Sequence, residues 1–517
     1  MSRKTVILAL LSTTVSVAPS FATGRTASSG SCPVGETKNV ILFIGDGMQL
    51  AHEIATSRYL YGRDQALSFH GLPYAGNVAT WDVTTYNKYA PLYGKPAYSP
   101  WAIVPRVGYD HARGGLLPWP LVPVPDESYF TSWYATDSAS AATAWATGFK
   151  TDDGNIAWAP GDPPNGALKT IAELMRERKD ASIGVVSTVP FTHATPAAHV
   201  AHNKSRSKYH EIADEILNVL KPDVVIGGGH PEFGGSQTYM PQALLDSIRS
   251  TAETPDSDNP SAEWELAERG AGRDGALWLL TAAQRAADRG KKLFGLFGGV
   301  GGNFESPEPQ DLPGTPLVLR ASLENPLLRD ATLAALKVLG ANENGFFVMI
   351  EQGDIDWANH ANDFQRVVGT TWDLHDAVRA ATDWVDQPGD AIDWCNTLMI
   401  VTSDHSNSYM RFKKDLGPGV LPEQVGVGSC GYGGPACTYP GGEVTYGSTG
   451  HTNELVRLYA VGQNASLFRR YEGRFYRRTR LLDNTQIYDV MSAATGLEFP
   501  FSAAKLQLAA EGGGAVR

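Results

Sequence analysis

Short apolar runs alternate along this chain with segments of helical periodicity. The apolar runs are NVILFI (39–44), IGVVST (183–188), DVVIGG (223–228), FFVMIE (346–351), TLMIVT (397–402) and VRLYAVG (456–462). Segments such as 168–178 and 330–339 lie between them and carry apolar residues at helical spacing. Alternating strands and helices are typical of parallel sheets covered on both faces. The sequence therefore predicts an α/β fold with a largely parallel central sheet flanked by helices on both faces.

The length of the chain suits one large domain with insertions. A chain of 517 residues, 42% of them hydrophobic, can bury a large core. We expect a single catalytic domain over residues 23–517, with surface insertions at about 81–133 and 411–447. The first insertion is rich in Trp, Tyr and Pro and shows almost no strand or helix pattern. It either covers the mouth of an active site or is a packed surface loop.

The first 22 residues have the pattern of an export signal. Arg3 and Lys4 precede a short apolar run at 5–18, and Ser20-Phe21-Ala22 offers small residues for cleavage. The run is shorter than the roughly 20 residues that a spanning helix needs. We expect residues 1–22 to be removed and the protein to be periplasmic or secreted; an uncleaved anchor is the alternative.

The four cysteines of the chain fit an oxidising compartment. Cys430 and Cys437 lie close together in CGYGGPAC, so we expect a local disulfide there. Whether Cys32 and Cys395 also pair stays open. The stretch 251–274 is polar and contains an acidic cluster. We expect a solvated loop there rather than a calcium site.

The net charge excludes one class of partner. The formal charge is −12, whereas nucleic-acid binding needs a basic surface. We therefore expect no role in nucleic-acid binding and no membrane span after signal cleavage. Phosphate remains a possible substrate, because bound metal ions can reverse the local field.

Acidic and imidazole groups stand at the ends of several predicted strands. Asp46 follows NVILFI, Glu351 ends FFVMIE, and Asp404-His405 follows TLMIVT. The carboxyl ends of parallel strands open onto one crevice. A single acidic residue in such a position is most often a helix cap, but several strands ending this way indicate a shared site.

Further ligand types flank these groups. Asp356 and His360 are four residues apart, so on a helix they share one face. His451 lies in the glycine-rich stretch GSTGHTN, just before VRLYAVG. Asp and His side chains suit zinc, whereas carboxylates with a hydroxyl suit magnesium.

The segment TDSASAATAWATG (136–148) supplies a candidate nucleophile. Asp137 can cap an alanine-rich helix, which places Ser138 at the helix N-terminus. Free N–H groups and the helix dipole favour phosphate there. A serine that only belongs to the cap is the structural alternative.

Taken together, these motifs resemble the alkaline phosphatase family. The matching stretches are FIGDGM (43–48), TDSASAATAWATG (136–148), THATPAAHVAHNKSR (192–206), IEQGDIDWANH (350–360), VTSDHSN (401–407) and GSTGHTNE (447–454). They follow the family's order over residues 39 to 462. Each motif alone is weak, whereas the combination is specific.

The resemblance implies a role for each matching residue. It implies a first zinc on Asp356, His360 and His451. It implies a second zinc on Asp46, Asp404 and His405, with Ser138 as the nucleophile. It implies a magnesium ion on Asp46, Thr195 and Glu351. It also implies that Arg206 clamps two phosphate oxygens, which its planar fork suits.

Two positions depart from the pattern of many family members. His193 stands where many members carry Asp, and Trp357 stands where many carry Lys, although others carry His or Trp. A histidine near the third site could change its metal preference. Loss of the lysine removes a cation near the phosphate.

The function implied by the resemblance is the hydrolysis of phosphate monoesters to an alcohol and inorganic phosphate. It implies a two-zinc mechanism through a covalent phosphoserine, an alkaline pH optimum and a possible homodimer. A sulfatase would need a C/S-x-P-x-R context that Ser138 lacks. A phosphodiesterase stays open, and a silent phosphate- or metal-binding protein would lack Ser138 or Arg206.

Overall fold

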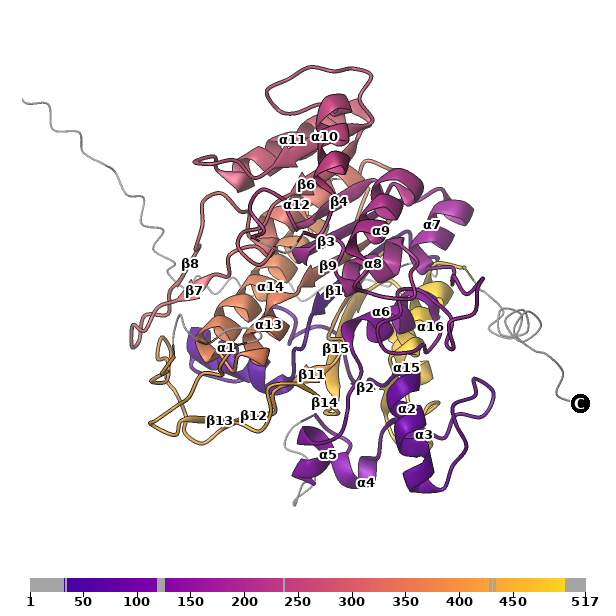
Figure 1. Cartoon of the computed structure of the whole chain (residues 1–517), viewed down its shortest axis with the longest axis vertical. Helices are drawn as coiled ribbons and strands as arrows, with labels where there is room; N and C mark the ends of the chain where they lie inside the picture. Colours follow the sequence, from indigo (N-terminus) through magenta and orange to yellow (C-terminus); the bar gives the residue numbers. More distant parts are fainter. Residues whose placement is uncertain are drawn as a thin grey trace, which may run out of the picture. The chain divides into compact units, whose positions relative to one another are not determined.

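A ten-stranded sheet runs through the protein (Figure 1). The computed structural model describes residues 32, 35–118, 126–235, 238–389, 391–426, 430 and 434–497. The predicted signal at 1–22 lies outside these residues, and the described residues from 35 onward form one compact unit. In sheet order, the strands are β16 (Leu481–Asp483), β2 (Tyr74–Ala79), β15 (Val456–Gly462), β10 (Thr397–Thr402), β1 (Asn39–Gly45), β9 (Phe346–Gln352), β3 (Ser182–Pro190), β4 (Val224–Gly228), β6 (Lys292–Leu296) and β5 (Trp264–Glu268).

The prediction of a largely parallel sheet is confirmed. Strand β15 is antiparallel to both of its neighbours, β10 and β2, whereas the remaining pairs are parallel. Every apolar run named above forms one of these strands. The sequence patterns did not indicate β2, β5, β6 and β16, and β5 lies within the stretch that we expected to be a solvated loop.

Helices cover both faces of the sheet, as predicted. Alternate residues of β1 enter two separate hydrophobic clusters, because successive strand side chains point to opposite faces. Leu42 packs with helices on one face and Phe43 with helices on the other. The first face carries α6 (Ser138–Thr147), α7 (Ile171–Lys179), α8 (Ala194–Val200), α9 (Tyr209–Asp214), α10 (Gln242–Thr251) and α16 (Thr485–Ala494). The second carries α11 (Gly275–Arg289), α12 (Leu328–Leu339) and α14 (Phe364–Val385).

The segment 81–133 is more ordered than its sequence suggested. Its described part folds into short helices: α2 (Val83–Tyr89), α3 (Pro105–Gly108), α4 (His111–Gly114) and α5 (Glu127–Thr131). Asp82 caps α2 through Thr85 N, and Asp110 caps α4 through Ala112 N. Helices of four to seven residues are too short to show a periodic pattern, which explains why they were not expected.

Two short strands pair at the two ends of the segment 411–447. Strands β12 (Met410–Phe412) and β13 (Val444–Tyr446) pair antiparallel. The predicted disulfide between Cys430 and Cys437 is present. No free cysteine occurs in the part of the chain that the structure describes. Within that same part, no helix combines the length and apolarity needed to cross a membrane.

Candidate active site

The carboxyl ends of three adjacent strands place acidic groups side by side. Strand β1 lies between β10 and β9, and Ile44 is paired with both Thr402 and Glu351. Asp46 and Asp404 therefore leave the sheet at the same edge where Glu351 ends β9. The crevice expected from the sequence is formed at this edge.

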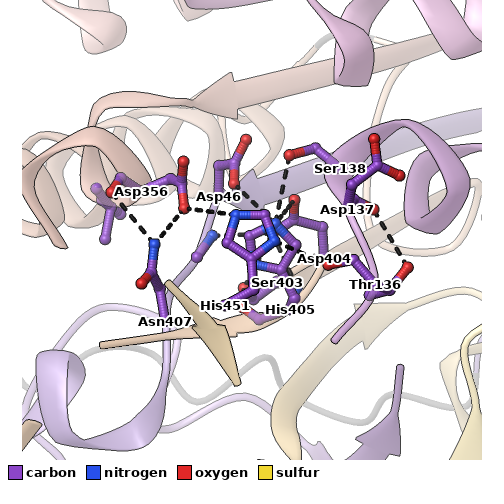
Figure 2. A network of polar contacts seen from close by, with 12 residues as sticks. Asp46, Thr136, Asp137, Ser138, Asp356, Ser403, Asp404, His405, Asn407 and His451 are labelled. Carbon is purple, nitrogen blue, oxygen red and sulfur yellow. Dashed lines mark hydrogen bonds and ion pairs between the residues drawn. The ribbon is translucent and has the colours of Figure 1, made fainter. Parts of the chain in front are cut away.

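Asp46, Asp404 and His405 form one group of ligand-type atoms (Figure 2). The Asp404 carboxylate is fixed by its Oδ1, which accepts hydrogen bonds from Gly47 N and His405 N, both at 2.9 Å. Its Oδ2 then lies 3.0 Å from His405 Nε2, and Asp46 Oδ1 lies 3.6 Å from the same nitrogen.

Asp356, His360 and His451 form a second group. Helix α13 (Asp354–His360) brings Asp356 Oδ2 to 3.2 Å from His360 Nε2, as the four-residue spacing predicted. His451 Nε2 lies 3.5 Å from Asp356 Oδ1 and 3.2 Å from His360 Nε2. His360 Nδ1 bonds to Thr449 O at 2.6 Å, and His451 Nδ1 bonds to Thr136 O at 2.8 Å. Since a carbonyl must accept, each Nδ1 carries a proton, so Nε2 is the ring nitrogen of each histidine that could bind a metal ion.

The two groups share a border. His405 and His451 stack with ring centroids 3.5 Å apart, and Asp356, His405 and His451 also meet within 4.8 Å. The resemblance places His405 with the second group only, whereas the structure puts it within reach of both. Two cation sites built from these residues would therefore be neighbours.

Glu351 and Thr195 lie behind Asp46. Ser187 Oγ donates a hydrogen bond to Glu351 Oε2, which aims the carboxylate. Thr195 Oγ1, Glu351 Oε1 and Asp46 Oδ1 are buried and have no hydrogen-bonding partner among the described residues. An oxygen-only donor set of this kind suits magnesium.

The electrostatics of these groups indicate bound cations. Burial, then the neighbouring Asp404, Asp356 and Glu351, raise the pKa of Asp46 well above its usual range. Burial likewise raises the pKa of Glu351 to about 7. Buried carboxylates in such a cluster repel one another unless positive charge is placed among them. The unpartnered oxygens, together with histidine Nε2 atoms that face carboxylates, fit divalent metal ions at the positions that the family resemblance implies.

Ser138 opens helix α6 beside these groups. Asp137 is the N-cap, and its carboxylate accepts from Ser140 N, as predicted. Ser138 Oγ lies 3.3 Å from His405 Nε2 (Figure 2). The hydroxyl is therefore in contact with the Asp46 group at a helix N-terminus, where phosphate is favoured.

Arg206 faces the same space from the loop that follows α8. Its Nη1 donates to Asp137 Oδ2 at 2.9 Å, and its backbone N–H donates to Gly154 O. Asp137 thus caps the helix that carries Ser138 and also orients the guanidinium. This arrangement leaves Arg206 at the edge of the cavity that holds Ser138 and Asp46.

His193 and Trp357 contribute to an aromatic wall. The centroid of the His193 ring lies 5.5 Å from that of Tyr209, on which it stacks, and 5.5 Å from that of Trp357. The Tyr239 ring contacts both His193 and Tyr209. Burial, then the nearby Arg206, lower the pKa of His193 to about 3, so its imidazole is neutral.

A cavity of about 1670 Å³ joins these parts. Its lining runs from Ser138 and His451 to residues 300–311, a loop that the sequence patterns did not single out. No described residue of 81–133 lines it. That segment supports the site from behind instead, because Tyr129 O accepts a hydrogen bond from Asn453, next to the loop that carries His451.

Two side chains and one backbone N–H that orient the candidate ligands were not singled out from the sequence. Asn407 Nδ2 donates to Asp356 Oδ1 at 2.6 Å, and Asn407 pairs with His451 through the bridge of β11 (Ser406–Asn407) and β14 (His451–Thr452). Ser187 aims Glu351, and Gly47 binds Asp404. Asn407 lies two residues after the Asp404-His405 pair, but its contact with Asp356 depends on tertiary structure.

Comparison with known proteins agrees with this geometry. The alkaline phosphatase family model matches residues 124–418 of the chain.

The chain belongs to the alkaline phosphatase family.

Several members can be compared with it directly. Alkaline phosphatase 3 of Bacillus subtilis is 27% identical over 72% of this chain, which spans 61% of that protein's length. The alkaline phosphatase of Escherichia fergusonii is 29% identical over 71% of this chain and 75% of its own length. Streptomycin-6-phosphate phosphatase of Streptomyces griseus is 28% identical over 95% of this chain and 96% of its own length.

Solved alkaline phosphatases share the fold. The enzyme of the Antarctic bacterium TAB5 has a TM-score of 0.56 at 21% identity, covering 90% of this chain and all of that one. The Thermus thermophilus enzyme has a TM-score of 0.57 at 20% identity, covering 93% and 96%. The predictions of the family and of the fold class are confirmed.

Proposed function

We propose that this protein hydrolyses phosphate monoesters to an alcohol and inorganic phosphate, with Ser138 as the nucleophile. The observation that carries the proposal is the position of Ser138 Oγ. It lies 3.3 Å from His405 Nε2, at a helix N-terminus and beside two adjoining groups of metal-ligand atoms. Membership of the alkaline phosphatase family supports the same reaction class.

The residues that would hold metal ions form three sets. Asp356, His360 and His451 would hold one zinc, Asp46, Asp404 and His405 a second, and Asp46, Thr195 and Glu351 a magnesium ion. When bound, these ions supply Lewis acidity, which stabilises negative charge on the phosphoryl group and on the attacking and leaving oxygens.

The protein's own groups position the phosphate and the nucleophile. Arg206, held by Asp137, would donate two parallel hydrogen bonds to nonbridging oxygens. Ser138 Oγ would attack phosphorus as the bond to the alcohol oxygen breaks, giving a phosphoserine and releasing the alcohol. Water would then hydrolyse the phosphoserine, which restores Ser138 and releases phosphate.

The disulfide and the sequence of residues 1–22 support export. Disulfides persist in oxidising compartments, and Cys430 and Cys437 are bonded. We place the protein in the periplasm or outside the cell, acting on small phosphate esters.

The nucleophile is tested with Ser138→Ala. The variant should lose at least about a thousandfold in kcat on p-nitrophenyl phosphate while its zinc content stays normal, since Ser138 is not needed to hold the ions. Radiolabelled phosphate should be trapped on the wild type at low pH and not on the variant. The matched control is Ser247→Ala, an exposed serine on α10.

The same assay separates the rival activities. Bis-p-nitrophenyl phosphate should be hydrolysed far more slowly than the monoester, and a chelator should abolish both activities. Near wild-type turnover by Ser138→Ala would refute the assignment of the nucleophile, and faster cleavage of the diester would favour a phosphodiesterase.

A further inference from the structure

The outer half of the cavity carries carboxylates at its rim. Glu308 and Asp311 lie on the loop 300–311, and Asp363 caps the N-terminus of α14. All three line the cavity that also contains Ser138. Asp46, which is only 7% exposed and belongs to the metal-ligand groups, lies in the same cavity, so a ligand at the rim and a phosphoryl group at Ser138 would share one space.

No basic side chain among the described residues forms an ion pair with these three carboxylates. Glu305, a fourth lining carboxylate, is neutralised by Arg269 at 2.8 Å, and the one arginine of the outer lining, Arg366, is paired with Asp354 at 2.7 Å. Glu308, Asp311 and Asp363 form no ion pair with any described residue. The outer cavity therefore has excess negative charge.

The rim is held rigidly on the framework of the site. Phe304 N donates to Thr188 O at 2.7 Å, and Arg366 Nε donates to Ser306 Oγ at 2.9 Å. Glu308 is paired with Leu319 through the short strands β7 (Glu308–Pro309) and β8 (Val318–Leu319). Ordering the rim on binding would cost little entropy, which favours a preformed subsite.

Another part of the cavity lining is aromatic and adjoins the loop 300–311, because Tyr239 Oη donates a hydrogen bond to Gly301 O at 3.0 Å. His193, Tyr209, Tyr239 and Trp357 form this part next to Arg206. The faces of tyrosine and tryptophan rings attract organic cations, and carboxylates do so over a longer range. A cation in this cavity is attracted both by the aromatic rings and by the rim carboxylates.

We propose that the outer cavity is a leaving-group subsite for organic cations, so that the preferred substrates are phosphate monoesters of alcohols carrying an ammonium or guanidinium group. This inference rests on the proposed phosphomonoesterase activity and names its substrate class. The metal-ligand groups and Arg206 would bind only the phosphoryl group, so they do not discriminate between esters of different alcohols. Discrimination falls to the rim and the wall, and an anionic leaving group is repelled there.

The test compares two esters of equal shape and different charge. Choline phosphate carries a trimethylammonium group, and 3,3-dimethylbutyl phosphate replaces its nitrogen by carbon. The zinc-loaded wild type should prefer choline phosphate by at least about fivefold in kcat/KM, and added salt should reduce this preference because the rim is open to solvent.

The rim variant is the double substitution Glu308→Gln and Asp311→Asn. It preserves the shapes of both side chains, including the oxygen of residue 311 that accepts from Leu421 N. The ratio of the two kcat/KM values should fall about threefold or more. The matched control is Glu343→Gln, an exposed acid that does not line the cavity, for which the ratio should stay at the wild-type value.

The outcomes distinguish the two proposals. Hydrolysis of both esters with a ratio near one in the wild type, or an unchanged ratio in the rim variant, overturns the cation subsite and leaves the phosphatase proposal standing. Failure to hydrolyse either ester or p-nitrophenyl phosphate overturns both.

Discussion

Gly47 separates the two groups of ligand-type side chains. Its φ is +66°, and a Cβ at this position would lie 2.8 Å from Asp356 Oδ1. Its N–H holds Asp404 Oδ1 at 2.9 Å. One residue without a side chain therefore sets the spacing between Asp356 and Asp404, and both its conformation and its close contact require glycine.

Replacing this glycine should damage the site directly. Gly47→Ala should reduce bound zinc and lower kcat/KM on p-nitrophenyl phosphate by at least about a hundredfold, because Asp356 must move away from the new methyl group. Metal analysis and steady-state kinetics measure both effects. Gly71→Ala is the control, since nothing lies within 4 Å of its Cβ position. A fully zinc-loaded, fully active Gly47→Ala would contradict this account.

The residues of the site could be predicted to different extents. Asp46, Glu351 and Asp404 were predictable because they stand at strand ends, where the topology of a parallel sheet brings them together. Ser138 was predictable from its place beside a capping residue. Asn407 and Ser187 were not, because they act through the side chains that they orient, and such pairing depends on tertiary contacts. Glu308 and Asp311 were not singled out, because the stretch 300–311 has no periodic pattern.

At the scale of elements, His202 lies in the loop that carries Arg206 and connects α7 to the π-helical segment Glu215–Leu220, which follows α9. Its Nδ1 lies 2.8 Å from Glu215 Oε1, and its Nε2 lies 3.2 Å from Glu173 Oε2 on α7. Burial lowers the pKa of His202, but hydrogen bonds to Glu173 and Glu215 outweigh it and raise the pKa to about 9. Burial raises the pKa of Glu173, but its hydrogen bonds to His202, to the backbone of Thr170 and to Lys169 outweigh burial and lower the pKa to about 2.

The stability from this cluster should depend on pH in a known direction. The folded pKa of His202 is above its ordinary value of 6.5, so its contribution is complete below about pH 6.5 and is lost as the pH rises through about 9. Glu173 contributes above its ordinary pKa of 4.5, and this is lost as the pH falls through about 2. The cluster should therefore stabilise the protein most between about pH 4.5 and 6.5.

We expect His202→Gln to lower the free energy of unfolding by about 1–3 kcal/mol at pH 6 and by less than about 1 kcal/mol at pH 10. Urea unfolding at both pH values measures the difference. The exposed His210→Gln serves as the control. Equal destabilisation at the two pH values would show that His202 acts through packing rather than through its charge.

The elements that sequence patterns identified are the central ones. Strands β1, β9 and β10 are buried on both faces, and their uninterrupted apolar runs reveal them. Strands β2 and β6 have a glycine within them, and β16 has only three residues, which weakens any pattern. Strand β5 lies at the edge of the sheet inside a polar stretch.

At the scale of the whole molecule, the disulfide closes a loop within the segment 411–447, and one of its cysteines is hydrogen-bonded next to the site. Cys437 N donates to Ala361 O, one residue after His360, and Leu421 of the same segment lines the cavity. Replacing Cys430 and Cys437 by serine should lower the free energy of unfolding by about 2 kcal/mol, the value expected for a short closed loop. Thermal unfolding and thiol titration check this, with reductant-treated wild type as the reference. If neither the double variant nor reductant lowers the melting temperature, the bond adds no stability.

The direction of strand β15 has a consequence for how the protein is made. Because β15 runs against its neighbours, its beginning lies at the edge where the parallel strands end, so His451 reaches the site just before that strand. Asp46 and His451 lie more than four hundred residues apart in the sequence. A nascent polypeptide therefore cannot assemble the full set of candidate metal ligands until the chain as far as His451 has left the ribosome. If the protein is exported before it folds, this order delays metal capture until after translocation, so the metal supply outside the cytoplasm would determine how much of the protein matures.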